Sequence, residues 1–109
     1  MPFVVRDITF WCEVDTDKIE ILELIKSNAG VLCVSVNIFD EFTKEIDIKI
    51  KSESENENME DVKLEKKMMK SLGYRLVYQD SSRTLTDLEV NAYSDVVYKI
   101  LEEKGLEIR

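Results

Sequence analysis

Apolar residues recur every three or four positions along residues 19–30, which is typical of a helix with one buried face. Asp15, Thr16 and Asp17 precede this stretch, and residues of these types commonly accept hydrogen bonds from the first N–H groups of a helix. Gly30 stands where helices often end, because a residue without Cβ adopts the left-handed conformation at little cost. The pattern therefore predicts a helix that ends at Gly30.

The next two stretches alternate between apolar and polar side chains. Residues 32–38 form the first alternating run and residues 46–50 the second, so each is expected to be a strand with one buried face. Asp40 and Glu41 lie between the runs, at a suitable distance for a short connection. The alternation predicts a hairpin with these two acidic residues at its tip.

Four further segments complete the predicted core. Residues 3–14 are expected to form the first strand, with large apolar side chains on both faces, as in a central strand. Residues 52–58 contain no apolar side chain and are expected to form a solvated loop. Residues 58–72 carry apolar side chains at helical spacing, which predicts a second helix ending at Gly73. Residues 74–79 then follow as a strand.

The last quarter of the chain predicts a third helix. Thr86 and Glu89 match a capping box, in which each side chain accepts from the other residue's backbone N–H, at the start of a helix over residues 86–104. An alternative interpretation extends a strand over residues 84–90 and begins the helix after it. Residues 106–109 have room to add a short edge strand.

The predicted order of elements is strand, helix, strand, strand, helix, strand, followed by an appended helix. Right-handed crossovers place the first two helices on one face of a four-stranded antiparallel sheet. The predicted fold class is therefore α+β, a ferredoxin-like βαββαβ sandwich with a C-terminal helix and a short fifth strand. A length of 109 residues indicates a single domain, residues 1–109, with the core at residues 1–80 and a C-terminal helical extension at residues 81–109.

Residues 19–74 resemble a heavy-metal-associated (HMA-like) domain in the run GVLCVSV, the hairpin into IDIKI and the predicted helix ending MKSLGY. That family binds soft metals through a Cys-x-x-Cys pair in the loop after the first strand. The corresponding loop here, EVDTDK at residues 13–18, contains no cysteine, so the metal-binding role does not follow. The order of elements is also similar to that of ACT-type amino-acid sensors, whose small-molecule site adjoins the place that Thr16 and Asp17 occupy. Both resemblances imply the fold.

The amino-acid composition narrows the range of possible functions. The chain contains 15 Lys and Arg against 23 Asp and Glu, a net charge of −8, which disfavours direct nucleic-acid binding and favours a basic protein partner. Histidine is absent, which removes the commonest general base and transition-metal ligand. Cys12 and Cys33 are expected to be reduced and buried in a cytoplasmic protein. No apolar run is long enough to span a membrane and no secretory signal is recognised. Catalytic residues, metals and cofactors are therefore not predicted.

Two surfaces are candidates for binding. The first is an acidic surface that would attract a basic partner; its members are Asp40, Glu41, Glu45, Asp47, Glu53, Glu55, Glu57, Glu60 and Asp61. The second is an apolar face opposite the first two helices, expected to serve a homodimer or another partner; its members are Phe3, Val5, Trp11, Tyr93 and Tyr98. The alternatives are a solvated linker for the acidic run and a third helix that covers the apolar face.

These features predict a non-enzymatic, acidic protein-binding module that is cytoplasmic and homodimeric. The more specific hypothesis is an inhibitor or adaptor that occupies a basic site on a larger, nucleic-acid-processing protein, by analogy of charge and size with anti-CRISPR proteins. The alternative hypothesis is a small-ligand or metal-sensing regulatory domain of ACT or HMA type. An enzyme ranks third, because no pair of carboxylates in distinct environments can be recognised.

Overall fold

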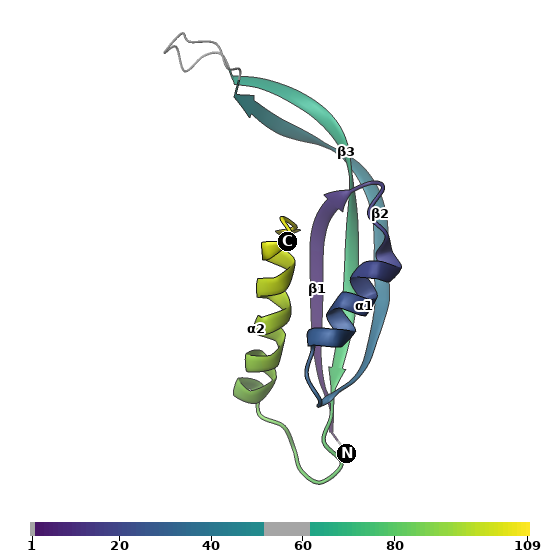
Figure 1. Cartoon of the computed structure of the whole chain (residues 1–109), viewed down its shortest axis with the longest axis vertical. Helices are drawn as coiled ribbons and strands as arrows, with labels where there is room; N and C mark the ends of the chain where they lie inside the picture. Colours follow the sequence, from purple (N-terminus) through teal and green to yellow (C-terminus); the bar gives the residue numbers. More distant parts are fainter. Residues whose placement is uncertain (1, 52–61) are drawn as a thin grey trace.

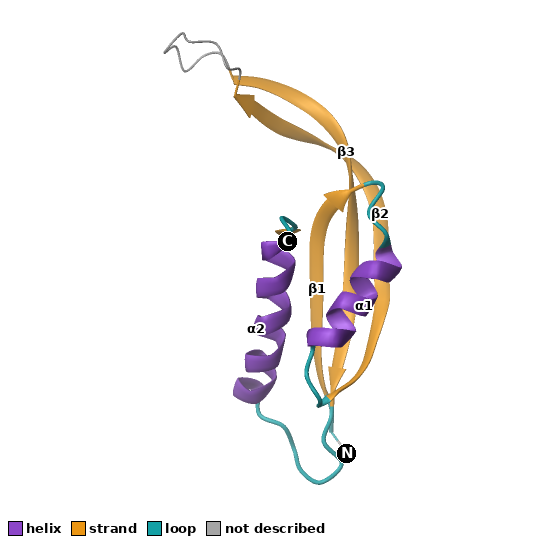
Figure 2. Cartoon of the chain, viewed as in Figure 1, coloured by secondary structure: helices purple, strands orange, loops and turns teal. Residues whose placement is uncertain are grey.

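The computed structural model of the chain describes residues 2–51 and 62–109. Two helices and four strands follow one another as β1 (Val4–Glu13), α1 (Lys18–Asn28), β2 (Cys33–Lys51), β3 (Val62–Tyr78), α2 (Asp87–Glu103) and β4 (Glu107–Ile108). The strands pair antiparallel in the order β2-β3-β1-β4, and both helices lie on one face of the sheet (Figures 1 and 2). The predicted α+β class with a ferredoxin-like βαββαβ arrangement is confirmed.

Local capping signals fix where both helices begin. The Asp17 carboxylate accepts hydrogen bonds from the backbone N–H groups of Ile19 (2.9 Å) and Glu20 (3.4 Å) and so caps α1. Thr86 and Glu89 form the predicted capping box at the start of α2. The alternative strand over residues 84–90 is therefore wrong.

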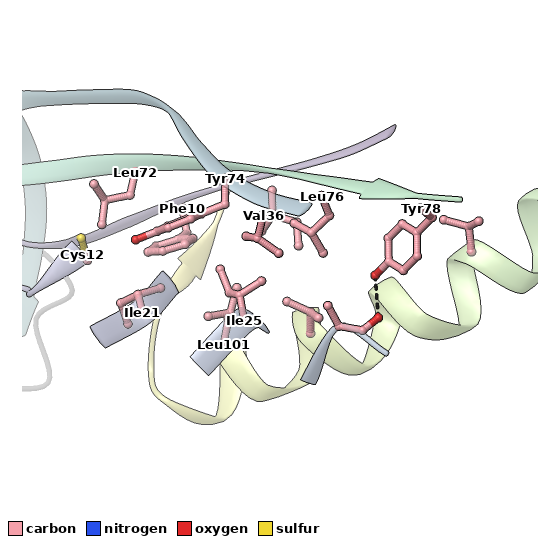
Figure 3. Close-up of a cluster of buried hydrophobic side chains, with 14 of the residues drawn as sticks. Phe10, Cys12, Ile21, Ile25, Val36, Leu72, Tyr74, Leu76, Tyr78 and Leu101 are labelled. Carbon is pink, nitrogen blue, oxygen red and sulfur yellow. Dashed lines mark hydrogen bonds between the residues drawn. The ribbon is translucent and has the colours of Figure 1, made fainter. Parts of the chain in front are cut away.

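The core lies between the helices and one face of the sheet. β1 contributes Phe10 and β3 contributes Tyr74, whose rings stack with centroids 5.8 Å apart. Neither side chain is exposed to solvent. The remaining members come from β1, α1, β2, β3 and α2 (Figure 3) and include Ile8, Cys12, Ile21, Ile25, Val36, Leu72, Leu76, Tyr78, Val90, Val97 and Leu101.

Two predicted elements are wrong. β2 runs unbroken through Asp40 and Glu41, which lie in the middle of a 19-residue strand and form no hairpin tip. The segment predicted as a helix over residues 58–72 belongs to β3 from Val62 onward. The physical reason is that apolar side chains also recur at even positions of this segment up to Tyr78, and pairing with β2 uses that period of two. The connection between β2 and β3 lies outside the described residues.

Residues 81–109 complete the sandwich and are not an extension of it. α2 supplies Val90, Val97 and Leu101 to the core, and β4 pairs with β1 through Phe10 and Ile108. The helix predicted to be a third, appended one is thus the second helix of the fold. It packs on the same side of the sheet as α1, and neither described helix lies on the opposite face, which we call the open face (Figure 1).

β2 and β3 extend beyond the rest of the sheet. β1 pairs with β3 only as far as the Glu13 and Met69 pair, whereas β2 and β3 continue to pair as far as Lys51 and Val62. We call residues 45–51 and 62–68 the arm. The arm projects and bends away from the body in Figure 1 and contributes to a longest dimension of 63 Å.

Candidate functional site

The open face of the sheet carries a cluster of two aromatic rings and one arginine around a serine. The rings of Trp11 and Phe42 meet edge to face, with centroids 5.7 Å apart and planes at 84°. The Arg109 guanidinium carbon lies 5.0 Å from the Trp11 centroid and 5.3 Å from that of Phe42. Its Nη1 donates a hydrogen bond of 2.7 Å to Ser71 Oγ. We call these four residues the Trp11 cluster.

Strand register assembles the Trp11 cluster. Ser71 on β3 pairs with Trp11 on β1 and with Phe42 on β2, so the three residues form one row across the sheet. Because serine is small, the two rings reach each other across the middle strand, and Ser71 is only 1% exposed beneath them. The backbone N–H of Arg109 donates to the carbonyl of Thr9 at 2.8 Å, which holds the arginine beside β1.

A second aromatic and arginine group lies two residues further along β3. The Phe39 ring covers Gly73, since a Cβ at that glycine would be only 2.9 Å from Phe39 Cζ. The Arg75 guanidinium lies 4.8 Å from the Phe39 centroid and donates to both carboxylate oxygens of Asp7, at 2.8 and 3.0 Å. These hydrogen bonds lower the pKa of Asp7. Phe39 is 41% exposed, so part of its surface remains open to a ligand.

This arrangement suits flat, anionic ligands. Aromatic side chains on a sheet can stack on nucleobases, and guanidinium groups beside them can contact phosphate oxygens or stack themselves. Asp7 neutralises Arg75. Within residues 2–51 and 62–109, Arg109 makes no ion pair with an acidic side chain. Arg109 is therefore a guanidinium on this face without an acidic side-chain partner in those residues, while Glu107 is paired with Trp11 and Asp40 with Gly73 in the sheet.

The residues predicted for an apolar face do not all lie together. Trp11 lies on the open face as expected, Val5 pairs with Val77 on β3, and Phe3, just before β1, is 61% exposed. The two tyrosines are on the helical side: Tyr93 stacks on Tyr78 with centroids 6.1 Å apart, and the Tyr98 hydroxyl donates to the Asp7 carbonyl at 3.3 Å. Because α2 packs beside α1, Tyr93 and Tyr98 do not share a surface with Trp11.

Sequence reasoning missed most of the open-face groups. Phe39 and Phe42 were hidden because the first alternating run was ended at residue 38 and a turn was placed after it. Arg75 and Arg109 carried no local signal, since each meets its aromatic partner only through strand pairing. Continued alternation beyond residue 38 would have extended the strand but placed Phe42 on the face of Val36 and Ile38. The register shift between Ile38 and Asp40 puts Phe42 on the open face instead, and the sequence carries no signal for that shift.

The predicted acidic surface is divided in the structure. Asp40 lies beside Gly73 in the middle of β2, and Glu41 forms an ion pair of 2.9 Å with Lys18 at the start of α1. Glu45 and Asp47 lie exposed in the arm. The other members lie outside the described residues: Glu53, Glu55, Glu57, Glu60 and Asp61.

The helical side of the molecule carries a cavity of about 490 Å³ next to Thr16 and Asp17, the place that the ACT-type resemblance indicates. Its polar lining is mostly acidic, with Lys104 at one side. The lining residues are Asp15, Thr16, Asp17, Glu20, Ile21, Glu23, Leu24, Ser27 and Lys104. The likeness to HMA and ACT domains remains a prediction.

Nucleophilic and metal-binding groups are poorly placed in the part of the chain that the structure describes. Burial raises the pKa of the Cys12 and Cys33 thiols, which keeps both protonated near neutral pH. Across residues 2–51 and 62–109, no three His, Cys, Asp or Glu side chains gather as a metal site would require. Neither described helix is long and apolar enough to cross a membrane.

Comparison with curated proteins connects nearly the whole chain to phenylalanine–tRNA ligases. It is 31% identical over 115 residues to the mitochondrial enzyme of Saccharomyces cerevisiae, covering 99% of this chain and 20% of that protein. Phenylalanine–tRNA ligase beta subunits are similar, with 32% identity over 103 residues in Listeria monocytogenes and 34% over 105 residues in Trichormus variabilis. These matches cover 94% and 95% of this chain and 11% of each subunit. No protein-family model matches the chain.

These relatives correct the function predicted from composition. An acidic inhibitor or adaptor of anti-CRISPR type is wrong, because the similar proteins are tRNA ligases and the similarity extends over almost all of this chain. The relatives are enzymes, but the chain spans only about a tenth to a fifth of their length. The physical reason for the error is that net charge averages over the molecule and does not describe any one face.

Proposed function

We propose that this chain is a non-catalytic RNA-binding domain of the kind carried by phenylalanine–tRNA ligases, and that the open face of its sheet binds unpaired nucleotides of a tRNA. The Trp11 cluster carries the proposal. The names of the relatives supply the class of RNA, because these enzymes act on tRNA. A role apart from catalysis is supported by the small share of each relative that the chain matches.

The geometry favours unpaired RNA over a duplex. Phe39 and the Trp11 cluster lie on adjacent rows of β3, at Gly73 and Ser71, so their centres are separated by about 6–7 Å along the strand. That spacing is close to the distance between successive bases of an extended single strand. Stacking on such rings requires bases that are not already stacked in a helix, as in loops.

The fluorescence of Trp11 provides a way to measure RNA binding. It is the only tryptophan of the chain, so its fluorescence reports on the open face alone. A tRNA specific for phenylalanine, a short unpaired oligoribonucleotide and a duplex of the same composition should be titrated at one fixed salt concentration. We expect the tRNA and the unpaired strand to quench Trp11 fluorescence, and the duplex to leave it nearly unchanged.

Substitutions test which rings contribute. Phe42→Ala and Phe39→Ala each remove one stacking surface, so each should weaken binding by about 5- to 150-fold, the equivalent of about 1–3 kcal/mol per stacked base. Leu88→Ala is the matched control, because Leu88 is 83% exposed on α2, on the helical side of the sheet. Equal affinity of all three variants for the tRNA would show that the open face does not bind it.

A further inference from the structure

The outer edge of β2 is free to pair in the described part of the chain. β2 is the first strand in the sheet order β2-β3-β1-β4, so only one side of its backbone is hydrogen-bonded to another strand. Within the arm, β2 and β3 pair without β1. A two-stranded ribbon is marginally stable in water, and an unpaired strand edge is a template for another strand.

The sequence of β2 in the arm is complementary to itself. Residues 45–51 read Glu-Ile-Asp-Ile-Lys-Ile-Lys. If two copies run antiparallel with position 48 on the two-fold axis, position 45 lies opposite 51, 46 opposite 50, and 47 opposite 49. In this register every acidic position lies opposite a lysine position and every isoleucine position lies opposite an isoleucine position. Each charged pair occurs twice, because a two-fold interface is reciprocal.

Other registers lose this match. A shift that places odd positions opposite even ones would set isoleucines against charged residues. A two-fold axis at position 47 would place Asp47 opposite itself, and an axis at position 49 would do the same with Lys49. Like charges directly opposite each other are destabilising. The axis at position 48 is therefore favoured over its neighbours.

We propose that two copies of this chain form a homodimer by antiparallel pairing of residues 45–51, with position 48 on the two-fold axis. The partner is a second copy because the segment is charge-complementary to itself and lies on a free strand edge. Edge pairing covers neither face of the sheet, so the Trp11 cluster stays accessible in the dimer. The inference is independent of RNA binding and survives if that proposal fails.

Glu45 and Lys51 are the most suitable positions at which to reverse the charge and test the dimer. In the register of its own chain, Glu45 lies opposite Met68 and Lys51 lies opposite Val62. Asp47 is less suitable because it is paired with Lys66 of its own chain. Glu45→Lys places lysines opposite each other at both ends of the interface, and Lys51→Glu does the same with glutamates.

Sedimentation equilibrium of the full chain at low salt gives the test. The unmodified chain should dimerise between about 1 µM and about 1 mM. E45K and K51E should each weaken the dimer about tenfold or more, since attraction becomes repulsion at two pairs. The double variant E45K/K51E should dimerise like the unmodified chain, and an equimolar mixture of the two single variants should form the heterodimer. A monomeric unmodified chain, or a mixture that stays dissociated, would overturn the proposal.

A crosslink tests the position of the axis without altering charge. Ile48→Cys places two cysteines opposite each other, with Cα atoms about 4.5–5.5 Å apart, within the range of a disulfide. Ile46→Cys is the matched control, because its two copies would be offset by about 13 Å along the strands. Mild oxidation should link the I48C chains and leave I46C at the background set by Cys12 and Cys33 in the unmodified chain. Equal crosslinking of the two variants would refute this register.

Discussion

Replacing Tyr78 with phenylalanine tests how the sheet holds α1. The Tyr78 hydroxyl donates a hydrogen bond of 2.9 Å to the carbonyl of Ala29, the residue that ends the helix (Figure 3). The last carbonyls of a helix lack an intrahelical donor, so this phenol supplies one. Four residues earlier on β3, the Tyr74 hydroxyl donates at 2.7 Å to the carbonyl of Lys18, where α1 begins. The two tyrosines thus fasten both ends of the helix.

The two hydroxyls should contribute unequally. Tyr78 and Ala29 are both fully buried, so Tyr78→Phe leaves a buried carbonyl without this donor and should lower the free energy of unfolding by about 1–3 kcal/mol. Tyr74→Phe should cost about 0.5–1.5 kcal/mol, because the Lys18 carbonyl also faces the N–H groups of the next turn of its own helix. The two sites are far enough apart for the losses in the double variant to add.

Urea unfolding followed by circular dichroism measures these losses. The midpoint should fall in the order unmodified, Y74F, Y78F, double variant, while the slope with urea stays constant because little surface changes. A Y78F variant as stable as the unmodified chain, or less affected than Y74F, would refute the idea that the carbonyl of Ala29 depends on this phenol.

The same tyrosines should make the fold sensitive to alkali. Burial raises the pKa of Tyr74 and Tyr78 above the ordinary value of 10.0. Above that pH the unfolded chain releases these protons while the folded chain keeps them. Their contribution to stability is therefore complete below pH 10.0 and is lost progressively as the pH rises further. Y78F should show a shallower loss of stability between pH 10 and 11 than the unmodified chain.

Two further predictions concern the ends of the helices. Gly30 and Gly105 both have positive φ, 99° and 83°, so alanine should cost about 1–2 kcal/mol at either position. Only at Gly30 would the new Cβ clash, with the ring of Tyr93, so Gly30→Ala should lose about 1–3 kcal/mol more than Gly105→Ala in urea unfolding. Equal losses would contradict the contact. Hydrogen bonds from Arg83 lower the pKa of Glu89 to about 2, so its contribution to stability is present above pH 4.5 and is lost as the pH falls toward 2. Glu89→Gln should therefore flatten the dependence of the melting temperature on pH in that window. Glu102→Gln, an exposed change in the last turn of α2, should not. Identical pH profiles for the two variants would show that the Glu89 carboxylate does not contribute to stability.

Both helices could be predicted because their signals are local. The Asp17 cap and the Thr86 and Glu89 capping box each act within one turn, so the sequence alone identifies where α1 and α2 begin. The fold class followed from the order of the elements. It proved correct although one predicted helix was a strand, because the helix predicted as an appendage took its place in the sandwich.

The first part of β3, up to residue 72, was missed because its alternation is interrupted by lysines. Lys66 and Lys70 occupy even positions that apolar residues hold elsewhere in the strand, and Lys, Glu, Met and Leu all favour helices. Lys70 is only 9% exposed, and its Nζ donates at 2.6 Å to the carbonyl of Thr16 in the loop before α1. In the sequence, a lysine that donates a hydrogen bond to a carbonyl far along the chain cannot be told from a solvated lysine on a helix. Pairing with β2 thus outweighed the helical preference of these residues.

The net charge of −8 misled the functional prediction because much of the negative charge lies away from the Trp11 cluster, although Glu107 is paired with Trp11 and Asp40 with Gly73 on the open face. Asp15, Asp17, Glu20 and Glu23 line the cavity beside α1, on the helical side, and Asp7 on the open face is neutralised by Arg75. Affinity that arises from stacking on Phe39, Phe42 and Trp11 needs few phosphate contacts, since base stacking and counterion release are separate contributions. An acidic chain can therefore bind unpaired RNA through one face. It should discriminate against duplexes more strongly than a basic protein does, because stacking is its main source of affinity and electrostatic repulsion opposes contacts that lack it.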